Sequence, residues 1–162
     1  AGLVVSTSVR SGRPGRPTTV YSTTSLPPTP ERTAGYRLLA EVLVDGLRST
    51  PVADTSLWAQ EVGERWGPRI VDRMGLRGTG SAMEVLHASF DAMGFEPDTS
   101  PQEVRLHACP FADLAMGNEA IICDLHLGMA RGMLDDLDAD VTTEELVPFA
   151  APSLCVLQLE ER

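Results

Sequence analysis

Several features that define other protein classes are missing from this chain of 162 residues. No apolar run approaches the roughly 18 residues that a bilayer crossing requires, so we expect no membrane-spanning helix. No charged segment followed by an apolar stretch opens the sequence, so we expect a cytoplasmic location and no secretory signal. GLRGTGS fits neither the P-loop nor the dinucleotide-binding pattern. Membrane proteins, secreted proteins and these two classes of nucleotide-binding enzyme are therefore not expected.

The charges are unevenly distributed along the chain. The formal net charge is −10, and all 13 basic residues are arginine because lysine is absent. Residues 1–37 contain five Arg and one acid, whereas residues 78–162 contain three Arg and sixteen acids. The first stretch therefore suits a polyanionic partner, and the second repels one.

The opening residues predict a β-hairpin with a polar tip. GLVVSTSV and PTTVYSTT are rich in β-branched residues, and a Gly/Pro loop joins them. We assign residues 1–24 to this hairpin, residues 25–34 to a Pro-rich linker and residues 35–162 to an α+β domain. Because AGLVV has the pattern of a strand interior and no Met, we expect the chain to lack its true beginning.

Three helices are predicted at the start of the α+β domain. They run from residue 35, over 56–74 and over 80–93. Pro68 predicts a kink or break in the second helix, and the S-x-x-E box at Ser81 marks the start of the third. One broad apolar stripe on the first helix predicts either a dimer contact or packing on its own domain, and includes Tyr36, Leu39, Leu43 and Leu47.

A β-β-α-β-β unit with a small antiparallel sheet is predicted to follow these helices. Residues 95–111 indicate two short strands around a Pro/Asp/Ser turn, and residues 119–137 indicate a helix. DVTTEELVPF and SLCVLQLEE indicate two more strands, linked by a turn at 148–152. The predicted fold class is α+β.

Cysteine is scarce, and its placement indicates a ligand site. Cys109, Cys123 and Cys155 all lie in the last third of the chain, and an odd number argues against a purely intramolecular disulfide framework. Cys123 and His126 are three residues apart and share one helix face. Pro110 turns the chain at Cys109, and Cys155 joins the others if its strand pairs beside the strand before Cys109. Thiolates favour an iron-sulfur cluster or zinc.

VRLHACPFADLAMGNEAIICDLHLGMARGML, followed by APSLCVLQL, resembles the C-terminal sensor half of ArsR-like and SufR-like winged-helix regulators. The opening segment GLVVSTSVRSGRPGRPTTVYSTT looks like the wing of their DNA-binding domain. The resemblance implies that Cys109, Cys123 and Cys155 hold an iron-sulfur cluster, with zinc as the alternative. SufR-type proteins have a fourth Cys, which is absent near DADVTT. Four candidates for the fourth ligand stay open: His126, His107, a carboxylate such as Asp124, and a small exogenous ligand.

The arginines of the hairpin tip then predict contact with double-stranded DNA. Arg10, Arg13 and Arg16 alternate with Gly and Pro, and arginine suits both phosphates and a narrow minor groove. We interpret the chain as the wing, sensor and dimerisation parts of a homodimeric transcriptional regulator, not an enzyme, whose base-reading helix lies before Ala1. The alternatives are a thiol-redox or small-ligand sensor without metal, and a cysteine-dependent enzyme using Cys109 and His107.

Overall fold

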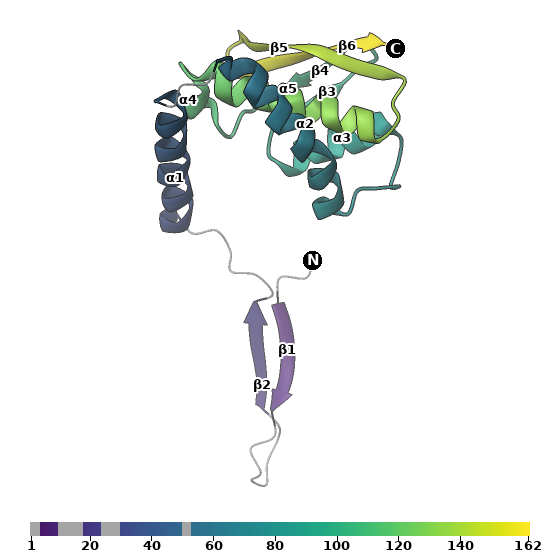
Figure 1. Ribbon diagram of the computed structural model, residues 1–162. Coiled ribbons are helices and arrows are strands. Elements are labelled where there is room, and N and C mark those ends of the chain that lie inside the picture. Colours follow the sequence, from purple (N-terminus) through teal and green to yellow (C-terminus); the bar gives the residue numbers. More distant parts are fainter. Residues whose placement is uncertain (1–3, 10–17, 24–29, 50–52) are drawn as a thin grey trace. The chain divides into compact units, whose positions relative to one another are not determined.

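The computed structural model describes residues 4–9, 18–23, 30–49 and 53–162 (Figure 1). The chain divides into two compact units, residues 1–43 and 44–162. In the first unit, β1 (Val4–Val9) pairs antiparallel with β2 (Thr18–Thr23). The predicted hairpin is therefore confirmed. Its tip, with the arginines expected to contact DNA, lies outside the described residues.

Helix α1 (Pro30–Arg48) begins before the predicted helix start at residue 35. Proline is favourable in the first turn of a helix, because its N–H is not needed there and its φ is already helical. The predicted linker at 25–34 therefore extends too far, since its last part is helical. At the C-terminal end of α1, Val44 and Leu47 belong to a small apolar cluster of the second unit.

Local signals place the next two helices correctly. In α2 (Thr55–Met74), the Asp54 side chain accepts a hydrogen bond of 2.9 Å from the Leu57 N–H. In α3 (Ala82–Ala92), Ser81 and Glu84 form the predicted capping box. Of the predicted kink or break at Pro68, the break is wrong, because α2 continues through this residue. Proline removes one N–H from the helix interior, and the packing of α2 against the body outweighs that loss.

The rest of the second unit confirms the α+β class with a small antiparallel sheet. Strand order is β3-β4-β6-β5, and every neighbouring pair is antiparallel. The remaining elements are β3 (Pro97–Thr99), β4 (Glu103–Leu106), α4 (Ala112–Ala115), α5 (Glu119–Asp136), β5 (Val141–Ala151) and β6 (Leu154–Glu161). The short α4 was not predicted as a separate helix. The turn expected at 148–152 is also too long, because β5 continues to Ala151 as an edge strand, where Pro148 is tolerated.

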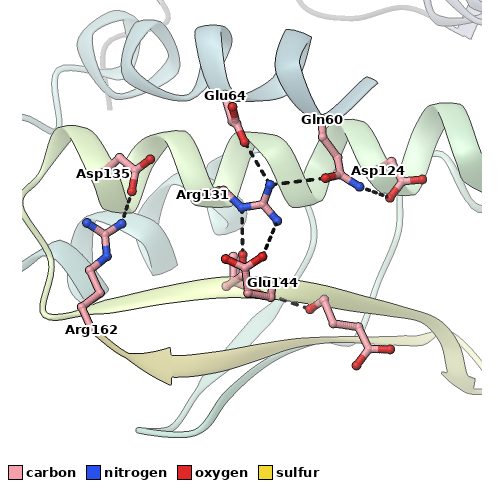
Figure 2. A network of polar contacts seen from close by, with 9 residues as sticks. Gln60, Glu64, Asp124, Arg131, Asp135, Glu144 and Arg162 are labelled. Carbon is pink, nitrogen blue, oxygen red and sulfur yellow. Dashed lines mark hydrogen bonds and ion pairs between the residues drawn. The ribbon is translucent and has the colours of Figure 1, made fainter. Parts of the chain in front are cut away.

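Helix α5 lies between α2 and the sheet, and two pairs of glycines set its distance from α2 (Figures 1 and 2). Gly63 and Gly67 of α2 face α5, while Gly128 and Gly132 of α5 face α2. A Cβ atom on Gly128 would lie 2.1 Å from the backbone oxygen of Gln60. The two backbones are therefore in direct contact, which no larger residue allows at these positions.

The other side of α5 helps to form the main hydrophobic core. The largest fully buried side chains of this core include Leu86, Phe90, Phe95, Leu106, Met133, Leu134 and Leu157. The core thus joins α3, α5 and the sheet, while the glycine faces join α5 to α2. Within the described ranges, none of the helices combines the length and the hydrophobicity that a bilayer crossing requires.

Arg131 connects all three layers through polar contacts (Figure 2). Its guanidinium donates to the Thr143 carbonyl of β5 at 3.0 Å and to Glu64 of α2 at 3.0 Å. Longer contacts reach Gln60 at 3.3 Å and Glu144 at 3.4 Å. The side chain is only 17% exposed, so these contacts compensate for the removal of its charge from water.

Candidate functional site

The three cysteines belong to three different elements of the second unit. Cys109 is half-buried in the connection from β4 to α4, Cys123 is buried on α5, and Cys155 is buried on β6. Strand β4 pairs with β6, with Leu106 opposite Cys155. The predicted pairing of the last strand beside the strand that leads to Cys109 is therefore confirmed. This pairing places Cys155 of β6 beside the end of β4, three residues before Cys109.

Burial is the main influence on the ionisation of Cys109 and Cys123. Burial, together with smaller effects of Cys155, Cys109 and acidic groups on the same helix, raises the pKa of the Cys123 thiol to about 12. Burial also raises the pKa of Cys109, an effect that the Phe111 N–H opposes and Cys155 reinforces. Cys109 and Cys123 are therefore protonated at neutral pH.

Neighbouring thiols do not by themselves make a metal site. Among the residues that the structure describes, no three His, Cys, Asp or Glu side chains are arranged to hold a metal ion. The donor types suit an iron-sulfur cluster or zinc, but the sulfur atoms do not converge on one point. The residues therefore fit these groups in their chemistry and not in their present arrangement.

His126 lies among aromatic rings. It is 6% exposed, and burial lowers its pKa to about 4, so the imidazole is neutral at physiological pH. Its ring stacks on Phe111 at 5.7 Å between centroids and meets the edge of Phe95 at 4.9 Å. The ring contacts of His126 are thus with Phe111 and Phe95, and no group of three or more metal ligands is found among the described residues.

The other proposed fourth ligands are also placed elsewhere. His107 is exposed, and the Asp124 carboxylate accepts a hydrogen bond of 3.0 Å from Gln60 of α2. Arg10, Arg13 and Arg16 lie outside the described residues. The structure thus leaves His107 facing solvent and Asp124 bound to α2.

Sequence analysis missed three aromatic residues around the site. Phe95 and Phe111 hold His126, and the Phe149 N–H donates to the Cys155 sulfur over 3.5 Å. Phe149 has a φ of 50°, in the left-handed region, at the irregular part of β5. Only Phe111 had a sequence signal, since it follows the Cys-Pro pair. The other two come from distant segments that only the fold brings close.

Comparison with known proteins leaves these assignments to physical argument. No family model matches the chain, and no curated protein or solved structure matches it either. The resemblance to ArsR-like and SufR-like regulators therefore stays a prediction.

Proposed function

We propose that this chain is the wing and the sensor part of a DNA-binding transcriptional regulator, with Cys109, Cys123 and Cys155 as its sensing groups. The observation that carries the proposal is that a loop, a helix and a strand of one unit each carry a cysteine, with Cys155 opposite Leu106 in the β4–β6 pair, three residues before Cys109. A ligand bridging such elements fixes their relative position.

Thiol chemistry favours a metal or an iron-sulfur cluster over direct oxidation. Redox-sensing cysteines react as thiolates and have a lowered pKa, whereas the pKa values of Cys109 and Cys123 are raised. A bound metal replaces the thiol protons, so its binding at these residues releases protons and strengthens as pH rises. The same raised pKa disfavours Cys109 as an enzymatic nucleophile.

Ligand binding has to rearrange the site, and this supplies a switch. The sulfur atoms do not surround a common point among the described residues, so binding must move α5, β6 and the loop after β4 toward one another. A ligand shifts such an equilibrium by its difference in affinity between the two arrangements. We propose that DNA affinity follows this shift.

The proposed DNA and dimer contacts belong to the first unit. The hairpin carries the arginine-rich segment between β1 and β2, which suits phosphate contact. Helix α1 exposes five large apolar side chains, a pattern typical of a surface that pairs with a second copy. They are Tyr36, Leu38, Leu39, Val42 and Leu43, each 54–69% exposed.

Anaerobic purification followed by absorbance spectroscopy and analysis of iron, sulfide and zinc tests the proposed site. We expect metal or cluster to be retained, lost in Cys123→Ser and Cys155→Ser, and kept in His87→Gln, a control whose ring nitrogen lies 3.0 Å from the Thr99 hydroxyl oxygen. Fluorescence anisotropy with labelled duplex DNA should show an affinity that changes with occupancy. The proposal would be refuted if the protein stays free of metal after anaerobic reconstitution and if its DNA affinity does not depend on any of the three cysteines.

A further inference from the structure

The outer face of α2 carries three arginines at intervals of four residues. Arg65, Arg69 and Arg73 are exposed, and the helix face opposite them is buried. An α-helix rises about 1.5 Å per residue, so the three Cα atoms are spaced about 6 Å apart along the axis. The arginines therefore form a regular row on one surface of the second unit.

Trp66 holds two of these arginines in place. The guanidinium carbon of Arg69 lies 5.4 Å from the centre of the Trp66 ring, and that of Arg73 lies 4.9 Å from it. A cation over an indole face is attracted by the ring and loses part of its rotational freedom. The row is thus partly ordered before any partner arrives.

No acidic residue in the described part of the chain forms an ion pair with Arg65, Arg69 or Arg73. Of the acids on α2, Glu64 is bound to Arg131 at 3.0 Å and Asp72 to Arg77 at 2.7 Å, and Glu61, four residues before Arg65 on the same face, forms no ion pair with it. Like charges four residues apart also destabilise an isolated helix slightly. The row is therefore not explained by the stability of α2, and its charge is available to an external anion.

A repeating anion fits this row better than a protein surface does. Protein interfaces are depleted of charge at their centre and insert aromatic anchors into pockets. Here the centre of the patch is charged, and Trp66 lies beneath guanidinium groups. DNA presents evenly repeated phosphates, and arginine binds phosphate through two parallel donors. The sixteen acids after residue 77 lie on other elements, and one of them close to the end of the row, Asp136, is bound to Arg77 at 2.6 Å.

We infer that Arg65, Arg69 and Arg73, ordered by Trp66, form a second binding surface for the phosphate backbone of duplex DNA. This inference rests on the proposed regulatory function and adds to it a contact made by the sensor unit itself. Because the contact is to phosphate, it adds affinity without sequence preference. It also means that a change at the cysteine site acts on a body that touches DNA directly.

The salt dependence of DNA binding tests the inference. The full chain is titrated into fluorescein-labelled duplex DNA of mixed sequence, and the logarithm of the association constant is plotted against the logarithm of salt concentration. Each phosphate contact contributes about −0.9 to the slope. We expect Arg65→Gln, Arg69→Gln and Arg73→Gln each to reduce the magnitude of the slope by about 0.9, and the triple variant by about 2–3. The triple Lys variant should keep most of it.

Arg105→Gln is the matched control, because it removes the same charge from a residue paired with Glu103 at 2.6 Å. Its slope should equal that of the wild type. As a second readout, DNA should alter Trp66 emission in the Trp58→Phe background by drawing Arg69 and Arg73 off the ring.

The possible outcomes separate this inference from the proposed function. An unchanged slope in the triple Gln variant, with a reduced slope when Arg10, Arg13 and Arg16 are replaced, overturns the α2 surface and leaves the regulator. Loss of self-association in the triple variant with an unchanged slope assigns the row to a protein contact and also overturns it. Absence of duplex binding by the wild type at low salt overturns both proposals.

Discussion

Replacing Gly128 by Ala tests the close contact between α2 and α5. The added Cβ atom would lie 2.1 Å from the Gln60 carbonyl oxygen, whereas ordinary contact begins at 3.4 Å. Its neighbours are backbone atoms of a packed helix, so no side chain can rotate away. The two helices therefore have to separate by about 1 Å, which weakens dispersion contacts along the whole interface.

We expect Gly128→Ala to lower the free energy of unfolding by about 2–3 kcal/mol. Overpacking of a close core typically costs about 1–3 kcal/mol, and the backbone contact places this site at the upper end. The better helix propensity of alanine offsets about 1 kcal/mol of a larger cost. For a unit of this size the change corresponds to a fall in Tm of about 10 °C.

Urea unfolding followed by circular dichroism measures this effect, with the slope against urea compared between variants. Gly46→Ala in α1 is the matched control, because its added Cβ atom meets nothing within 4 Å and should leave stability equal or slightly higher. If Gly128→Ala unfolds within about 0.5 kcal/mol of the wild type, the direct backbone contact between the helices is wrong.

Two further predictions concern buried polar groups. Arg131→Met should lower the free energy of unfolding, measured in urea, by about 2–4 kcal/mol, because the buried Thr143 carbonyl and the acids of α2 and β5 lose their donor. Arg131→Lys should lower it less, since lysine replaces these contacts only in part. Arg105→Met, at an exposed ion pair, should change the free energy of unfolding by less than about 1 kcal/mol. The pKa of His126 is about 4 in the folded chain and 6.5 for the free side chain, so the unfolded chain binds the proton first as pH falls. The contribution of the neutral His126 to the free energy of unfolding is therefore fully present above pH 6.5. It is lost as pH falls toward 4, by up to about 3 kcal/mol. Relative to the wild type, His126→Phe should retain more of its stability between pH 6.5 and 4, and an equal loss in both proteins would contradict the buried neutral imidazole.

Local sequence signals gave the elements of the fold because their causes are local. The Ser81 capping box acts within one turn and was found where expected, and the second helix begins one residue before its predicted start. The early start of α1 at Pro30 was missed because a run of prolines was interpreted only as a linker. Pro68 was overrated because the close packing of α2 on α5 is a tertiary effect that no single helix reveals.

The sequence predicted which strands carry or lead to the cysteines, but it did not predict the aromatic residues around them. The pairing of the last strand beside the strand before Cys109 was predicted and is confirmed, but among the described residues the three cysteines do not form a ligand cluster. His126 was expected beside Cys123 from helical spacing alone, but the rings of Phe95 and Phe111 decide its position. Likewise, counting charges over long stretches hid the row of arginines on α2, whose interval of four residues was a visible signal.

Helix α5 connects the two proposals physically. One end carries Cys123, its glycine face rests on the backbone of α2, and Arg131 joins it to both α2 and β5. A close-packed interface transmits displacement, because backbone atoms already in contact cannot absorb a shift. If a ligand draws Cys123 toward Cys155, α5 must carry α2 with it, and the arginines on the outer face of α2 move relative to the sheet. In a Gly128→Ala protein that still folds, the looser contact should weaken the effect of the cysteine site on DNA affinity while leaving binding of the ligand itself nearly unchanged.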